Sequence, residues 1–352
     1  MRRTLIFITV ALALMACNKT NFTVTATFQT SDFNGKTAYL VNYDTQDTLD
    51  SVVISNKCLQ LTGTAKEPYM ARLIIDGSRM MFVVENGDIA IDWGSHKVSW
   101  TPLNEKFMEF AKGGDAIDAE AEKLDSTFNS GKMAKADYDK ASKALQSKMK
   151  NYYQKCYNEN KDNPVGFASF MQYLFAANFN SAELNAAINA APASYKSMTR
   201  IKKALANAKQ QELTAVGKKF TDFTVKTDEG KTMKLSDYVG KGKVTLVDFW
   251  ASWCPSCRAE MKNLKAIYGK YNSKGFTLLG VAVWDKPSDT KAAIKELQLP
   301  WEQIINAQTI PSDLYGFNAI PHIILFDKNG MILARGLQGQ ELSAKVDDAM
   351  KK

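Results

Sequence analysis

The cysteines Cys254 and Cys257 carry the clearest chemistry in this sequence. They end the segment VDFWASWCPSC, residues 247–257, where a strand-like apolar run meets the start of a helical pattern. A cysteine at a helix start meets unsatisfied N–H groups and the positive end of the helix dipole, and both favour the thiolate. Cys254 is therefore the predicted nucleophile. Cys257, one turn later, is placed to attack a mixed disulfide formed at Cys254, which would release the partner reduced.

Other uses of a Cys-x-x-Cys pair must be compared with this one. A structural zinc site needs a second ligand pair, and neither Cys58 nor Cys156 has a neighbouring partner. Covalent haem attachment needs histidine after the second cysteine, where this chain has Arg258. A structural disulfide stays open as the main alternative, although the spacing at a strand–helix junction disfavours it. We expect no metal and no cofactor beyond the redox-active disulfide itself.

The residues around the dithiol, from about 214 to 352, alternate between strand and helix patterns. Strands are expected at 244–249, 276–283, 323–326 and 331–334, and helices at 257–271, 288–297 and after Glu341. The run Asp327-Lys328-Asn329-Gly330 predicts a hairpin between the last two strands. Such alternation is typical of an α/β sheet with helices on its faces.

LVDFWASWCPSC, followed downstream by AIPHIILFDKNG, resembles the thioredoxin fold, and in particular extracytoplasmic thiol-disulfide oxidoreductases of the TlpA and ResA type. The similarity covers residues 216–352. It implies that Pro321 is the cis-proline facing the dithiol. It also implies that Asp248 is a buried acid that assists proton transfer at the resolving thiol. Glu260 matches the glutamate of a CxxCxxE motif, although an acid in an early helix turn is also favoured by the helix dipole alone. Many ResA-type proteins lack the aspartate, so the division of labour between the two acids is open.

The same resemblance implies a docking surface and a class of substrate. Trp253, Ile320 and His322 would contact the substrate, although His322 could instead point along its strand, and Trp250 could be core. The implied activity is disulfide exchange with protein substrates, with reduction favoured, electrons from a membrane thiol-disulfide donor, and apocytochrome among the substrates. A disulfide oxidase or isomerase, or a binding lipoprotein with a thioredoxin-like scaffold, are the alternatives. A peroxidase is disfavoured because the Pro-x-x-x-Thr-x-x-Cys arrangement is absent.

The first half of the chain divides into two patterns. Residues 23–100 contain short strands punctuated by Asn-Gly and Asp-Gly turns, which predicts an all-β domain. This domain resembles a small β-domain at the N-terminus of many Bacteroidetes thioredoxin-like lipoproteins, with Asn56-Lys57-Cys58-Leu59 replacing the usual Gly-aromatic turn. Residues 101–213 have an apolar stripe of helical period that ends at Cys156, which predicts a helical section with a buried Cys156. The predicted fold class is therefore multidomain: all-β, then helical, then an α/β thioredoxin fold at 214–352.

The start of the chain predicts the compartment. Arg2 and Arg3 precede an apolar run over 5–15 and then Leu-Met-Ala-Cys, which resembles a bacterial lipoprotein signal. Eleven apolar residues suit a signal peptide and fall short of the roughly 20 that span a bilayer. We expect residues 1–16 to be the signal, Cys17 the lipid attachment and 17–22 a tether. The protein would then be lipid-anchored in the cell envelope, facing the periplasm. An ordinary cleaved signal or a short uncleaved anchor is the alternative.

The charge balance bears on nucleic-acid binding. The chain has 45 basic and 37 acidic residues, a formal net charge of +8, and +6 if Arg2 and Arg3 are removed with a leader. The two signs are interleaved along the chain, so we expect no nucleic-acid partner.

Overall fold

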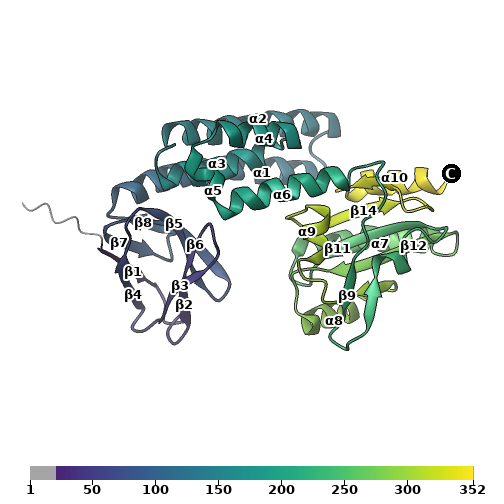
Figure 1. Ribbon diagram of the computed structural model, residues 1–352, viewed down its shortest axis with the longest axis horizontal. Helices are drawn as coiled ribbons and strands as arrows, with labels where there is room; N and C mark the ends of the chain where they lie inside the picture. Colours follow the sequence, from purple (N-terminus) through teal and green to yellow (C-terminus); the bar gives the residue numbers. More distant parts are fainter. Residues whose placement is uncertain (1–20, 352) are drawn as a thin grey trace, which may run out of the picture. The chain divides into compact units, whose positions relative to one another are not determined.

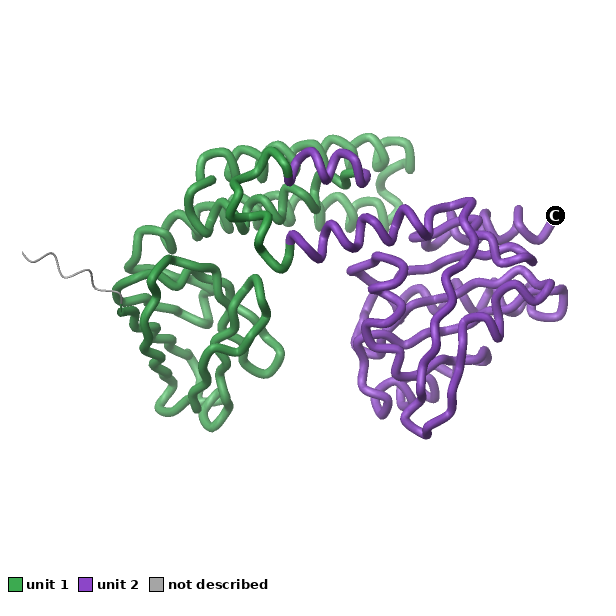
Figure 2. The backbone as a smooth tube through the Cα atoms, viewed as in Figure 1, with its two compact units in different colours: residues 1–179, 189–200 green, residues 180–188, 201–352 purple. Residues whose placement is uncertain are grey.

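The computed structural model describes residues 21–351 and forms two compact units. Figure 2 shows the first unit, which reaches Phe179 and includes Asn189–Arg200, and the second, which contains Asn180–Ile188 and the chain from Ile201 onward. The predicted signal peptide and Cys17 lie outside the described residues. Within residues 21–351, no helix combines the length and apolar character needed to span a bilayer.

The first unit begins with two four-stranded sheets, in the orders β4-β1-β7-β8 and β3-β2-β5-β6 (Figure 1). Alternate residues of both sheets are buried in one cluster, for example Val24 and Leu61 from the first sheet and Leu40 and Leu73 from the second. The strands are β1 (Asn21–Thr27), β2 (Thr37–Asn42), β3 (Thr48–Val53), β4 (Cys58–Thr64), β5 (Tyr69–Ile75), β6 (Ser78–Val84), β7 (Gly87–Asp92) and β8 (Lys97–Ser99).

The turn between β3 and β4 shows how the chain accommodates the missing glycine. Asn56 and Lys57 both adopt positive φ, 50° and 57°. Ser55 and Cys58 exchange backbone hydrogen bonds of 3.1 and 2.9 Å. Two central residues of positive φ define the type I′ turn that matches strand twist. The hairpin therefore closes tightly with two non-glycine residues in the left-handed region.

Six helices follow, and the third begins at an asparagine–proline pair. The side chain of Asn163 accepts the N–H groups of Val165 and Gly166 at 3.0 and 3.3 Å, with Pro164 as the first helical residue of α3. Cys156 is buried in α2, as predicted. The helices are α1 (Pro102–Asn129), α2 (Lys135–Glu159), α3 (Pro164–Ala177), α4 (Ser181–Ala190), α5 (Ala193–Ser197) and α6 (Thr199–Leu213).

The second unit is built on a five-stranded sheet in the order β13-β12-β11-β14-β15, with β11, β12 and β13 parallel and the other two antiparallel. Helices α7 and α10 cover one face, and α9 with the β9–β10 hairpin covers the other (Figure 1). The elements are β9 (Thr224–Lys226), β10 (Thr232–Lys234), the 3-10 turn η1 (Leu235–Asp237), β11 (Val244–Trp250), α7 (Pro255–Tyr271), β12 (Phe276–Ala282), α8 (Pro287–Glu296), β13 (Glu302–Ile304), α9 (Ile310–Tyr315), β14 (His322–Phe326), β15 (Ile332–Arg335) and α10 (Gly339–Met350).

The end of α6 is attached to this second unit by side-chain hydrogen bonds. Arg335 donates to the carbonyl and hydroxyl oxygens of Thr214 at 2.9 and 2.8 Å. Gln211 donates to the carbonyl of Gly316 at 2.6 Å. Residues 201–213, which the sequence groups with the helical section, therefore pack with the α/β sheet. The predicted fold class, with its β, helical and thioredoxin-like α/β parts, is confirmed.

Candidate active site

The central strand β11 aims its side chains alternately at the two faces of the sheet. Leu246 and Trp250 belong to the core that contains Met261 of α7, whereas Val247 and Phe249 belong to the core on the opposite face. Since side chains along a strand alternate with period two, Asp248 lies on the α7 face. The strand therefore brings this acid beneath the helix that carries the dithiol.

Cys254 stands at the N-cap of α7, directly after the loop that follows β11. Its Sγ accepts the backbone N–H of Cys257 at 3.2 Å, and Pro255 is the first helical residue. Cys254 and Cys257 form a disulfide and are both buried. The predicted helix-start environment of Cys254 is thus present, with an N–H group directed at the sulfur.

The segment that contains Pro321 lies against the dithiol. The peptide bond between Ile320 and Pro321 is cis. The Sγ of Cys254 lies 3.7 Å from the carbonyl oxygen of Ile320 and 3.4 Å from the hydroxyl of Ser256. In the disulfide the sulfur has no proton to donate. In a reduced Cys254 thiol the same carbonyl would be a hydrogen-bond acceptor within reach.

Asp248 is buried with an incomplete set of hydrogen bonds. The residue is 1% exposed, and its Oδ1 has no hydrogen-bond partner. Burial in this apolar setting, together with the nearby charge of Glu260, raises the pKa of Asp248 to about 8. An acid with a pKa close to neutrality can both accept and donate a proton under ordinary conditions, which is the behaviour required of a general acid–base group.

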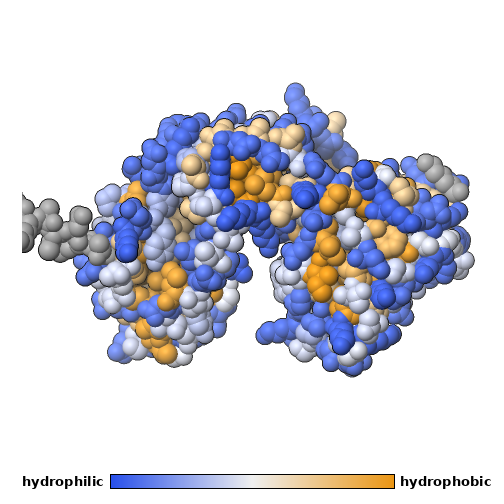
Figure 3. Space-filling view, viewed as in Figure 1, coloured by the Kyte–Doolittle hydropathy of each residue, from blue (hydrophilic) through white to orange (hydrophobic). Residues whose placement is uncertain are grey.

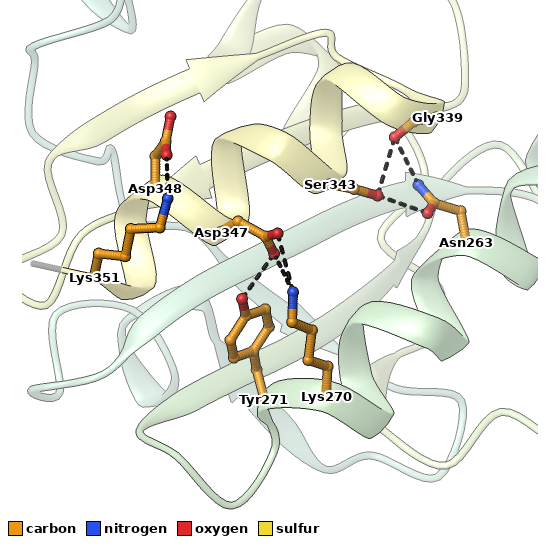
Figure 4. A network of polar contacts seen from close by, with 8 residues as sticks. All are labelled: Asn263, Lys270, Tyr271, Gly339, Ser343, Asp347, Asp348 and Lys351. Carbon is orange, nitrogen blue, oxygen red and sulfur yellow. Dashed lines mark hydrogen bonds and ion pairs between the residues drawn. The ribbon is translucent and has the colours of Figure 1, made fainter.

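Glu260 is half-buried on α7 and bound to the start of α10. Its carboxylate accepts the backbone N–H of Gly339, the first residue of α10, at 3.0 and 3.2 Å, and the amide of Asn263 at 2.8 Å. Figure 4 shows further contacts between these helices, in which Asp347 accepts from Lys270 and Tyr271. The acid therefore holds α10 in place and carries negative charge near Asp248.

Two of the docking residues expected from the sequence, Trp253 and Ile320, differ in their exposure. Trp253 is 58% exposed, and its indole N–H donates to the carbonyl of Trp284 at 3.0 Å. Ile320 is half-buried beside Cys254. Trp250 is fully buried core. Figure 3 shows hydrophobic residues gathered on part of the visible surface of this unit.

His322 directs its side chain to the face of the sheet opposite α7, and its docking role stays a prediction. Its ring stacks on Phe317 at 4.6 Å, and its Nε2 is 3.3 Å from Arg335. Both contacts belong to the α9 face of the sheet, since β14 alternates its side chains as β11 does. Burial, and then the charge of Arg335, lower the pKa of His322 to about 3. The ring is therefore neutral, and it lies half-buried on the face of the sheet opposite α7.

Asp285 also belongs to this region, although no sequence motif marks it. It follows β12, the strand next to β11, and it is buried against Ser252. An acid at the carboxyl end of a strand that neighbours the dithiol strand is the signal that could have indicated it, because functional groups of open α/β sheets gather at that edge.

Elsewhere, the described residues contain no cluster of three or more His, Cys, Asp or Glu side chains arranged to hold a metal ion. A cavity of about 650 Å³ lies in the first unit, and its lining combines aromatic residues such as Tyr69, Phe167 and Tyr195 with polar and charged ones. The dithiol is not part of it.

Comparison with known proteins finds one family match near each end of the chain. Residues 216–335 match the AhpC/TSA family, and residues 22–107 match a domain of unknown function, DUF4369. The thiol-disulfide oxidoreductase ResA of Geobacillus thermodenitrificans is 30% identical over 123 residues, which cover 35% of this chain and 70% of that protein. ResA of Bacillus thuringiensis is 27% identical over 143 residues, 41% of this chain and 81% of the relative.

Among solved structures, the thioredoxin domain of a thiol-disulfide oxidoreductase from Bacteroides vulgatus is 34% identical. The match covers 38% of this chain and 96% of that one, with a TM-score of 0.34. The chain belongs to the ResA-type thiol-disulfide oxidoreductases. The predicted resemblance, the thioredoxin-fold enzyme class and the N-terminal β-domain are confirmed.

Proposed function

We propose that this thiol-disulfide oxidoreductase is a membrane-tethered, periplasm-facing reductase of protein disulfides. The observation that carries the activity is the Cys254–Cys257 disulfide at the N-terminus of α7, with Cys254 against the carbonyl of Ile320. The exposed Trp253 supports a protein-sized substrate, because a large apolar ring at the surface suits docking of another polypeptide.

In the proposed reaction the Cys254 thiolate attacks one sulfur of the substrate disulfide. The substrate S–S bond breaks, one substrate thiolate leaves and takes up a proton, and Cys254 is joined to the other substrate sulfur. Cys257 then loses its proton and attacks the Sγ of Cys254. The Cys254–Cys257 bond forms and the second substrate thiolate leaves, so that the substrate gains two electrons from the dithiol. A membrane thiol-disulfide donor would restore the dithiol.

Asp248 is the proposed acceptor of the Cys257 proton. With a pKa of about 8, roughly a tenth of the molecules carry an ionised Asp248 at pH 7. The ionised form can take the proton, and the protonated form can return it to the departing thiolate. Because the acid is mostly neutral at pH 7, its repulsion of the Cys254 thiolate becomes important only at about pH 8 and above.

The activity is tested with the two single cysteine variants. Cys254→Ser should abolish insulin-disulfide reduction with dithiothreitol as donor. Cys257→Ser should retain the first attack and accumulate a covalent mixed disulfide, visible on a non-reducing gel. Full exchange activity in both variants would refute the assignment. The reduction potential tests the direction: a value near −270 mV supports a reductase, and one near −120 mV an oxidase.

The proposed membrane attachment rests on the sequence around Cys17. Metabolic labelling with palmitate should mark the wild type and leave Cys17→Ala unlabelled. The chain lacks an acidic run after Cys17 that resembles a surface-export signal, so it should be protected from protease on intact cells. Digestion on intact cells would contradict the periplasmic orientation.

A further inference from the structure

We propose that Asp285 is a positioning residue of the dithiol, which fixes the loop before Cys254 through a double hydrogen bond to Ser252. This inference rests on the dithiol chemistry alone and is independent of the substrate and of the direction of electron flow.

Asp285 uses all of its acceptor capacity inside the protein. It is 7% exposed. Its Oδ2 accepts the backbone N–H of Ser252 at 2.7 Å and the hydroxyl of Thr290 at 2.8 Å. Its Oδ1 accepts the hydroxyl of Ser252 at 2.9 Å and the N–H of Lys286 at 2.9 Å. Two of the four donors belong to one residue, Ser252, which lies two positions before Cys254.

The backbone of Asp285 is also held by hydrogen bonds. The amide of Gln308 donates to its carbonyl at 2.8 Å, and its hydrogen bonds to Lys286 and Thr290 attach it to the start of α8. The preceding residue, Trp284, accepts the indole N–H of Trp253 through its carbonyl. The Ser252–Trp253 pair is therefore attached by three hydrogen bonds to one rigid corner of the sheet.

This attachment matters because the loop decides where Cys254 stands. Cys254 is an N-cap residue, so its Sγ meets the N–H of Cys257 only when the backbone entering α7 has the extended conformation seen here. A loosened loop would let the Cys254 sulfur leave the neighbourhood of Cys257. The effective concentration of one sulfur toward the other would fall, and the disulfide would form less favourably.

The test is the equilibrium between the dithiol and glutathione in three variants of the full chain. Asp285→Asn keeps the side-chain shape and replaces one acceptor oxygen by an NH₂ group. This group cannot accept the hydrogen bonds of the N–H and O–H donors that surround it. We expect the equilibrium to shift at least tenfold toward the dithiol, about 30 mV in reduction potential. Thr290→Val is the matched control, because it removes one of the same four hydrogen bonds and leaves both bonds to Ser252 intact. It should lower the thermal stability and leave the potential unchanged.

Ser252→Ala provides a milder variant, because it removes only the hydroxyl bond to Asp285 and keeps the N–H bond. We expect at least a threefold shift in the same direction. If Asp285→Asn shifts the potential no more than Thr290→Val, Asp285 only stabilises the fold and the proposal is wrong. Should Asp285→Asn fail to fold, Ser252→Ala decides: a threefold shift supports the proposal and an unchanged potential overturns it.

Discussion

Glu85 in the first unit and Asp248 in the second are both buried carboxylic acids, yet their surroundings are opposite. Glu85 Oε1 accepts the backbone N–H groups of Leu103 and Asn104 at 2.8 and 3.0 Å. It thereby caps α1, whose own N-cap residue, Thr101, makes no side-chain cap bond. Asp248 Oδ1 accepts nothing. Burial alone therefore does not identify a functional acid, and the supply of donors separates the two roles.

Asp285 belongs with Glu85 in this comparison, although it lies beside the dithiol. Each of its oxygens accepts two hydrogen bonds, so its chemistry is to hold its neighbours in place. Asp248 lies on the adjacent strand of the same sheet and lacks such donors. Two buried acids of one sheet thus differ in their hydrogen-bond donors, which fits the proposed role of Asp285 in positioning the loop and that of Asp248 in moving protons.

The lack of donors around Asp248 has the largest expected effect, because it makes the stability of the fold depend on pH. The pKa of Asp248 is about 8 in the folded protein and close to 4 in the unfolded chain. Between these values the folded protein holds a proton that the unfolded chain has released, so the free energy of unfolding falls as the pH rises through this window. Asp248→Asn removes the dependence. Relative to wild type, the variant should gain on the order of 4 kcal/mol between pH 4 and pH 7.

Urea unfolding of the oxidised proteins at a series of pH values measures this difference. Asp285→Asn serves as the comparison, because it replaces a buried carboxylate whose oxygens already accept four hydrogen bonds. Parallel pH profiles for wild type and Asp248→Asn would show that Asp248 is not held in its neutral form.

A smaller effect is expected at Glu85, where the role is structural. Glu85→Ala removes the acceptor of two backbone N–H groups at the start of α1, which should lower the stability of the first unit by about 1–3 kcal/mol. Hydrogen exchange at the amides of Leu103 and Asn104 should become faster, while insulin reduction by the dithiol stays unchanged. Exchange rates equal to wild type would show that the cap contributes nothing.

The sequence predicted the elements of the second unit well because their patterns are local. Strand β11 is a mostly apolar, fully buried run, and the break at Cys254-Pro255 combines an N-cap with a proline at the first helical position. The resemblance of the chain to known oxidoreductases also predicted that Asp248 is buried and that Pro321 follows a cis peptide bond. The residue before that proline, Ile320, has its carbonyl 3.7 Å from the Sγ of Cys254.

Contacts between residues far apart in the chain could not be predicted from the sequence. Asp285 reaches Ser252 across 33 positions, and Glu260 reaches Gly339 across 79. The orientation of His322 has a different origin. Its position after Pro321 suggested the site, but the alternation of β14 turns its side chain toward Phe317 on the opposite face.

The smallest expected effect is at Glu260, whose charge contributes to the pKa of Asp248. Burial is the first cause of the raised pKa of Asp248, and the charge of Glu260 is the second. Glu260→Gln removes that charge and keeps an oxygen that can accept the N–H of Gly339. The pKa of Asp248 should therefore fall, by under about one unit, and remain well above that of an exposed aspartate.

The measurement is the stability difference between proteins with Asp248 and with Asp248→Asn, repeated across pH in the Glu260→Gln background. The pH at which this stability difference stops growing should fall by the same small amount. The lost charge at the start of α10 should itself change the free energy of unfolding by only about 0.5 kcal/mol. A collapse of the whole pH dependence would mean that Glu260, and not burial, keeps Asp248 protonated. The proton chemistry of the site would then depend on the contact between α7 and α10, because that contact holds Glu260 in place.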